Sequence, residues 1–466
     1  MANKAIVRLA VLGLLAGILV SSFFVLSPLY LSGIIFVLAG ICCYWRRFIW
    51  LLIVIFFLIG NWRTQMVIRY QPAVPATIDA LAVVRYRDYS DDQQKLRLQI
   101  RGIPGAVQIA VNRFPVYHYG DVLRVRCQPQ LTSQETEQSW QRRLQLQGIS
   151  ARCFSAVVSY DHSSIDWRSP FFTFKDYIIN VYIKTLPGPV AGLMQAMIVN
   201  ERGEVARDTT SNFSRSGLSH IVAISGMNMT LLIIAGQTFL VRLGLRRRQT
   251  AIFLIVVLTV YVMIIGLPAS AVRAALMSSV VLLGYLVRRP IDITHTLLLV
   301  AGILALVNPL AVVYDIGWQL SFLALAGLIW WTPWWTRTLH WLPERWGLQE
   351  LISATLAAQM LTWPLILYYF QIWALCFLPA NILTVPLVGP IMISGLLLPL
   401  VWWIPIVGAV ISLVVTLLIR WLLLVVTTVG SSSWAVLPIP FSSVALLLSA
   451  GLMIILTKLV NEKSSH

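Results

Sequence analysis

The sequence predicts a mainly α-helical membrane protein that crosses the bilayer about twelve times, with some broken helices and one inserted small β-barrel domain outside the cytoplasm. Three observations predict this class. Of the 466 residues, 58% are hydrophobic and 11% are charged, whereas soluble proteins are nearer a quarter charged. Apolar runs of bilayer length recur along the chain. Residues 72–168 interrupt them with alternating, strand-like patterning.

Roughly twenty apolar residues span a bilayer, and twelve segments approach that length. The expected spans are 7–26, 29–44, 48–62, 219–241, 250–267, 269–287, 293–308, 317–335, 351–370, 376–402, 406–429 and 441–458. Four prolines mark 376–402 as a candidate broken helix or pair of half-helices: Pro379, Pro386, Pro390 and Pro399. Lys4 and Arg8 precede the first apolar run, as in a signal peptide. No small-residue cleavage site follows, so we expect a retained first helix.

The basic residues predict the orientation. Net charge is +17, of which 72–168 contributes only +3, from 12 Lys+Arg and 9 Asp+Glu. If each span crosses once, the main basic clusters lie on one side, which is then cytoplasmic: Lys4/Arg8, Arg46-Arg47, Arg242 with Arg246–Arg248, Arg288-Arg289, Arg337/Arg345 and Lys458/Lys463. Both termini are then cytoplasmic and 72–168 is outside. A polyanionic substrate is a second source of basic excess.

The expected domains are transmembrane helices over 1–71, an extracytoplasmic β domain over 72–168, an amphipathic interfacial helix with a polar connector over 169–218, and a transmembrane domain over 219–466. Five strand-like runs and one helical stretch, Ser139–Gln147, suit an OB-like barrel; a different small β-barrel is the alternative. The strand-like runs are Thr77–Arg87, Leu96–Ile103, Ala106–Arg113, Val122–Cys127 and Ile149–Val158.

The cysteines predict one disulfide, Cys127–Cys153, because both lie on expected strands of one domain in an oxidising compartment. Two free buried thiols are the alternative. The membrane-embedded Cys42, Cys43 and Cys376 are expected to be free.

Several polar groups lie where lipid would make them costly, since an unsatisfied polar group in hydrocarbon costs several kcal/mol. Ser225, Gly226 and Asn228 interrupt a span soon after His220, which indicates a kink and a polar lining; small-residue helix packing is the alternative. Arg273 follows Pro268 by a little over one turn and either faces a pore or snorkels to the interface.

Further polar candidates follow along the chain. Gln319 and Ser321 enter a span together, with interhelical hydrogen bonding as the alternative. Asn381 lies between two prolines, which suggests exposed backbone carbonyls lining a space. Arg420 lies mid-span, where pairing with Asp315 is the alternative. We expect His220, Ser225, Asn228, Arg273 and Gln319 to converge on one polar cavity within the membrane.

Catalytic signatures are absent from the sequence. There is no P-loop, no H-E-x-x-H, no H-x-H-x-D-H run and no G-x-S-x-G elbow. An intramembrane enzyme using Ser225 and His220 is disfavoured, because five residues along a helix place them roughly 140° apart. We therefore expect a conduit that is not an enzyme and needs no cofactor or metal.

Five ordered segments resemble the ComEC/Rec2 competence proteins. Leu218–Met229 resembles their G-x-x-H-L-x-A-I-S-G-L-H segment, with Asn228 where the family usually has His, which puts any role for an imidazole there in doubt. The other matches, in chain order, are Asn200–Gly203, Ser270–Met277, Asn308-Pro309 with Gln319–Phe322, and Pro379–Pro386.

The resemblance implies a channel that takes up transforming DNA as a single strand across a bacterial cytoplasmic membrane. It implies as partners, besides membrane lipid, an extracytoplasmic DNA receptor, a cytoplasmic helicase or single-strand-binding protein, and a separate nuclease. Many relatives end in a metallo-β-lactamase-like domain, which we do not expect in this sequence. The lining residues would be His220, Ser225, Gly226, Asn228, Arg273, Gln319, Ser321, Asn381 and Arg420. A secondary transporter of a small anionic solute is the alternative.

Overall fold

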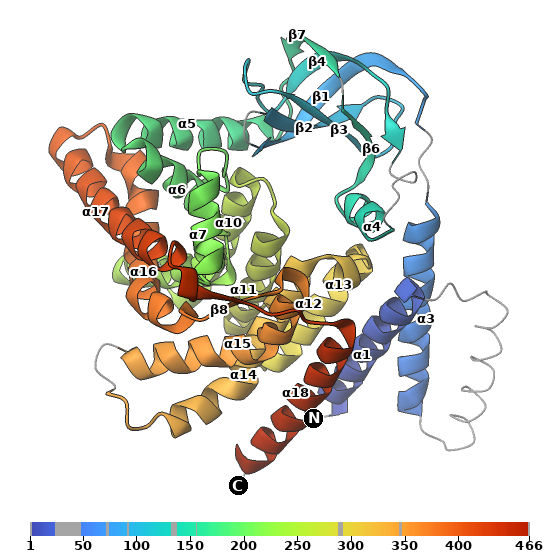
Figure 1. The fold of residues 1–466 in the computed structure, drawn as a ribbon, viewed down its shortest axis with the longest axis vertical. Coiled ribbons are helices and arrows are strands. Elements are labelled where there is room, and N and C mark those ends of the chain that lie inside the picture. The colour runs from blue at the N-terminus through green and yellow to red at the C-terminus, as the bar shows by residue number, and fades with distance from the viewer. Residues whose placement is uncertain are drawn as a thin grey trace. The chain divides into compact units, whose positions relative to one another are not determined.

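The computed structural model describes residues 2–23, 48–70, 74–90, 93–131, 138–154, 156–287, 292–343 and 347–464 (Figure 1). The chain forms two compact units. The first comprises Met1–Ser169 with Ile291–Gln319, and the second Pro170–Pro290 with Leu320–His466. The expected span 29–44, the cysteines Cys42 and Cys43, and two of the basic pairs lie outside the described residues: Arg46-Arg47 and Arg288-Arg289.

The first unit contains the expected sheet domain. Its seven strands follow the order β5-β6-β3-β2-β1-β4-β7, and all pairings are antiparallel except β3 with β6. The bounds are β1 Ile78–Ser90, β2 Gln93–Ile100, β3 Ala106–Asn112, β4 Asp121–Cys127, β5 Gln130–Leu131, β6 Ile149–Cys153 and β7 Val157–Ser163, with helix α4 Gln138–Leu146 before β6. The expected last strand, Ile149–Val158, is therefore two strands, and β5 was not expected.

Alternation builds the core of this domain, because successive side chains of a strand point to opposite faces. Along β2, Leu96, Leu98 and Ile100 are buried, whereas Lys95, Arg97 and Gln99 are not. The buried residues of the other strands join them in one cluster: Ile78, Ala82, Val84, Val107, Ile109, Leu123, Val125, Cys127 and Cys153.

The predicted disulfide between Cys127 and Cys153 is present, with the two Cα atoms 6.1 Å apart, within the usual range. Cys127 ends β4 and Cys153 ends β6, two strands that are not neighbours in the sheet. The bond therefore links strands that no direct ladder of hydrogen bonds joins. Cys376 is free and buried, as expected.

Two helices of the first unit pack backbone against backbone. In α1 (Ala2–Phe23) and α3 (Phe48–Arg69), a Cβ added at Gly17 would lie 2.0 Å from the carbonyl oxygen of Phe57. Small residues permit this approach. Between the helices, the Gln65 side chain donates to the Ser21 hydroxyl at 3.0 Å. The unit also contains α12 (Ile293–Val307) and α13 (Ala311–Tyr314), and the Arg8 guanidinium pairs with Asp292 at the start of α12.

The second unit is helical. Its helices are α5 Ser169–Thr185, α6 Gly188–Val199, α7 Arg207–Arg215, α8 Ser219–Val222, α9 Gly226–Arg242, α10 Arg247–Ile264, α11 Ala269–Val287, α14 Ile316–Thr338 (which begins within the first unit), α15 Leu348–Phe370, α16 Phe377–Val401, α17 Pro405–Gly430 and α18 Ser443–Ser464. Within the described parts of the whole chain, seven helices are long and apolar enough to cross a membrane: α1, α3, α10, α15, α16, α17 and α18.

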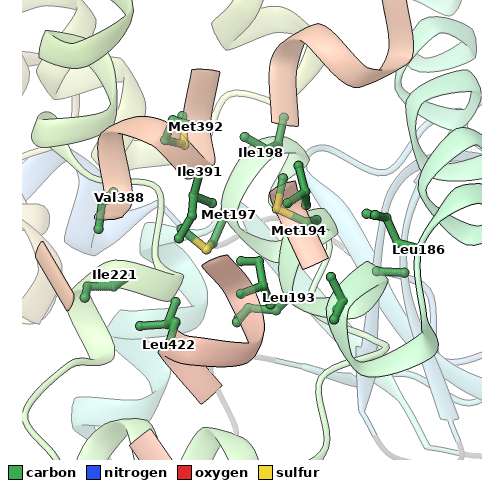
Figure 2. Packing of buried hydrophobic residues seen from close by; sticks show 14 of the residues in the cluster. Leu186, Leu193, Met194, Met197, Ile198, Ile221, Val388, Ile391, Met392 and Leu422 are labelled. Carbon is green, nitrogen blue, oxygen red and sulfur yellow. The ribbon is translucent and has the colours of Figure 1, made fainter. Parts of the chain in front are cut away.

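The core of the second unit lies where α6 meets α16 and α17. Figure 2 shows Met194 and Ile198 of α6 among residues of α16 and α17. A Cβ at Gly395 of α16 would lie 2.2 Å from the terminal methyl carbon of Met194, so this glycine gives the methionine side chain its place.

Helix α16 is continuous, so the expectation of a broken helix at 376–402 is wrong. At Pro399, a side chain from another helix satisfies the carbonyl that the proline releases. Pro399 has no N–H to donate to Gly395, and the Tyr182 hydroxyl donates to that carbonyl oxygen instead, at 2.8 Å. The Trp421 indole of α17 also donates to a carbonyl of α16, that of Leu383, at 3.2 Å.

The turn between α16 and α17 lies beside α5. The Tyr177 hydroxyl donates to the Pro399 carbonyl at 2.9 Å and accepts from the Trp402 indole at 3.0 Å. The sequence predicted α5 in the outer interface, whereas strict alternation of twelve single crossings placed this turn in the cytoplasm. The contacts make these two expectations incompatible. At least one of them is therefore wrong.

Removing the disulfide is expected to destabilise the sheet domain by about 3 kcal/mol, because the bond restricts the unfolded chain. In full-length protein in membranes, Cys127→Ser with Cys153→Ser should increase tryptic cleavage within 72–168. Cys376→Ser should leave the cleavage rate unchanged. Equal cleavage of the double variant and the unsubstituted protein would contradict the prediction.

Tyr182→Phe is expected to lower the stability of the helical unit by about 1–3 kcal/mol, because a buried carbonyl loses its donor. Thermal unfolding in detergent measures the effect. Tyr368→Phe is the control, since in the described part of the chain its ring packs on Tyr369 and no bond of its hydroxyl is seen. Equal melting temperatures for the two variants would show that the Gly395 carbonyl finds another donor.

Candidate functional site

A helix break lies where the sequence predicted one. Helix α8 ends at Val222, Ala223 and Ser225 have extended backbones, and α9 begins at Gly226. The first N–H groups of a helix have no partner within it, and the Ser225 side chain makes no capping hydrogen bond to them. The break therefore presents main-chain donors beside the Ser225 hydroxyl.

The residues around the break differ in exposure. His220, on α8, is exposed. Gly226 is exposed and Ser225 half-buried, whereas Asn228 is 1% exposed.

Asn228 is only weakly satisfied. Its side-chain oxygen lies 3.5 Å from the Ser225 hydroxyl, at the limit of a hydrogen bond. Its buried side-chain nitrogen has no partner among the described residues. Because a buried unsatisfied donor costs about 1–3 kcal/mol, this amide is not explained by helix stability.

Helix α11 adjoins the break. A Cβ added at Gly226 would lie 3.9 Å from the Ala274 Cβ, so the Ser225-Gly226 and Arg273-Ala274 segments pack together. Arg273 is 4% exposed, and it therefore does not lie on the surface of the bundle, as snorkelling to lipid headgroups would require. Leu267 sets the start of α11 with a left-handed backbone, φ +58°.

The start of α16 also adjoins this region. A Cβ at Gly217, which has φ +74°, would lie 2.8 Å from the Phe377 Cβ. Asn381 of α16 is 5% exposed, and its side-chain amide donates to the Phe377 carbonyl of its own helix at 2.7 Å. Asn381 thus secures the first turn of α16, and the expected exposed carbonyls are not seen there.

Three further predicted residues belong to α14 and α17. Gln319, in the first unit, donates to the carbonyls of Val312 and Val313 at 3.0 and 2.7 Å and so closes the end of α13. Ser321 is half-buried on α14. Arg420 is exposed on α17, on a helix face that it shares with the exposed residues Leu417, Trp421 and Leu424. The break between α8 and α9 thus lies next to the Arg273-Ala274 segment of α11. The convergence of Gln319 on the same place stays a prediction.

Two features of the connector were missed by the sequence analysis. Arg215, the last residue of α7, donates to the carbonyls of Gly430 and Ser432 at the end of α17, a favourable place for a cation. Lys175 and Glu201 form an ion pair of 2.9 Å with side chains 12% and 7% exposed. The only available signal was the concentration of charge in an otherwise apolar chain.

Within the described residues, no group of three or more His, Cys, Asp or Glu is arranged to hold a metal ion. The fold and the site together define a protein of long apolar helices with a sheet domain and a polar break among its helices. The family model described as "Competence protein" matches residues 197–464, and the chain belongs to this family.

The chain is similar to the ComE operon protein 3 of Bacillus subtilis (strain 168), with 30% identity over 221 residues. The match covers 47% of this chain and 28% of that protein, so the chain spans well under two thirds of the relative's length. No solved structure matches the chain.

Proposed function

We propose that this protein forms a conduit that carries single-stranded DNA across the bacterial cytoplasmic membrane during natural competence. The observation that carries the proposal is the polar break at Ser225-Gly226, packed against the segment of the buried Arg273. Both segments lie within the residues that match the competence family. The printed name of the relative, a product of a competence-type operon in Bacillus subtilis, is consistent with this role.

The physics of the substrate fits these groups. A single strand carries one negative charge per phosphate, so a sequence-blind path needs positive potential and donors without a code for base edges. A buried guanidinium and the unpartnered N–H groups that begin a helix both favour anions. Burying Arg273 is costly for a membrane protein, and this cost supports a functional role.

The sheet domain supports the proposal as an OB-like barrel. β5 follows β4 after two residues and pairs with β6, so the β4–β5 segment joins β1 on one side to β6 on the other. The parallel pair β3–β6 and the meander β1–β2–β3 complete such a barrel. The disulfide Cys127–Cys153 then fastens the segment that closes it.

The proposal assigns transport to this chain and leaves other steps to partners. A receptor outside the membrane would deliver DNA, a nuclease would remove one strand, and a cytoplasmic helicase or single-strand-binding protein would pull the other. Both termini are expected in the cytoplasm, but twelve single crossings cannot be combined with an α16–α17 turn that lies outside beside α5. The Trp331–Thr457 hydrogen bond of 3.0 Å supports one side for the ends of α14 and α18, which carry Arg337 and Lys458.

Arg273→Ala is expected to abolish uptake of labelled DNA in a competent host that carries this chain in place of its own, with normal protein in the membrane. Arg273→Lys should retain part of the uptake if the charge acts by steering, and little if bidentate contacts are needed. Arg248→Ala, which removes an exposed guanidinium of α10, is the control that should remain near normal. Normal uptake in Arg273→Ala would reduce the break to a packing feature.

Cysteine-accessibility labelling tests the orientation. Single cysteines at Arg247 should be protected from an impermeant reagent added outside, whereas cysteines at Gln130 should react. A cysteine at Trp403, in the α16–α17 turn, should react on the same side as one at Phe174 of α5. A cytoplasmic Gln130 would invert the orientation.

A further inference from the structure

The outward face of β2 is basic. Its outward positions are Lys95, Arg97 and Gln99, and Arg101 follows the strand. Asp88 of β1 faces Lys95, but no acidic residue stands on β2 itself. The outward side chains of β2 are therefore all basic or neutral, in a domain whose net charge is only +3.

A row of facing residues crosses this strand. Directly paired residues in a sheet share a face, and the register places five of them in line across β1, β2, β3, β6 and β5: Tyr86, Arg97, Gln108, Arg152 and Gln130. With neighbouring strands about 4.8 Å apart, the row from Tyr86 to Arg152 is roughly 14 Å long. We call it the transverse row.

Aromatic rings flank both guanidinium groups of the transverse row. The Arg97 guanidinium carbon lies 4.7 Å from the centre of the Tyr86 ring. The Arg152 guanidinium carbon lies 4.9 Å from the Phe154 ring and 5.5 Å from the Trp140 ring of α4. Phe154 is 61% exposed and Trp140 38%. These exposed rings do not contribute to the hydrophobic core, which is formed by side chains on the opposite face of the sheet.

Among the described residues, three acids of this domain have partners away from the row. Asp79 accepts from Arg126 at 2.6 Å, Asp121 accepts from Ser163 at 2.7 Å, and Asp166 accepts from the Arg85 guanidinium. These carboxylates lie on β1 positions paired with β4, on β4 itself, or after β7. The row itself holds two guanidinium groups and no carboxylate.

We propose that the transverse row, with Trp140 and Phe154, binds single-stranded DNA by stacking unpaired bases on its rings and guanidinium planes. The inference rests on the proposed function and names a receiving site outside the helical unit. Stacking suits any base, because each has a π-face, and exposed aromatics beside cations are the means by which sequence-blind sites hold single strands. Paired bases in a duplex do not offer those faces.

The test measures binding of a fluorescein-labelled oligo-dT to the full-length protein in lipid nanodiscs over a range of salt. Trp140→Ala with Phe154→Ala should weaken binding about ten-fold or more, since stacking contributes ~1–3 kcal/mol per base, without changing the salt dependence. Arg152→Ala should weaken binding and lower the slope of log K against log salt by about 0.7. A duplex of the same length should bind less tightly than oligo-dT.

Trp167→Ala is the matched control, because its ring also lies beside a guanidinium, Arg168 at 4.9 Å, and is 64% exposed, but it is outside the row. It should bind like the unsubstituted protein. An intact Cys127–Cys153 bond on a non-reducing gel shows that each variant folds. Unchanged oligo-dT affinity in both row variants, or tighter binding of the duplex, overturns the proposal.

The uptake assay separates this inference from the proposed function. If the unsubstituted protein takes up DNA and the row variants bind normally, the receiving site is wrong and the conduit stands. If row variants lose binding while the unsubstituted protein carries no DNA, the site stands and the conduit fails.

Discussion

Every backbone carbonyl within lipid needs a donor, and the helical unit is organised around that requirement. Tyr182 supplies the donor that Pro399 cannot, on Gly395. Arg215 closes the end of α17, and the Tyr261 hydroxyl donates to Ile198 at the end of α6, at 2.8 Å. These contacts join helices far apart in sequence, so the requirements of single carbonyls also fix the positions of α5, α7 and α10.

The same requirement separates structural from functional polar groups. Asn381 and Gln319 both give their side-chain amides to carbonyls of nearby helix ends, although the buried side-chain oxygen of Gln319 has no partner among the described residues. Asn228 is buried with a side-chain nitrogen that no described residue satisfies. His220 is exposed at the end of the segment before the break. Polar groups whose hydrogen bonds the fold does not satisfy are the candidates for a polar path.

The sheet domain is stabilised differently, because water can satisfy the backbone groups at its edges. A disulfide, and not the surrounding lipid, constrains its fold. Its small core is held by alternation along each strand and by one disulfide between strands that are not neighbours. Outward positions are therefore free of the packing role that limits the helices. Rings and guanidinium groups can stand together there without a cost to the core.

The sequence by itself determined the membrane class, the sheet domain, the disulfide and the break at Ser225-Gly226. Each follows from a local property: hydropathy, alternation, compartment, or small polar residues within an apolar run. Only the tertiary structure decided that α16 is continuous and that its turn lies beside α5. It also decided that Gln319 and Asn381 serve helix ends, while Gly226 adjoins Ala274 next to Arg273. These outcomes depend on which distant side chain reaches a given carbonyl, and periodicity along one chain carries no information about that partner.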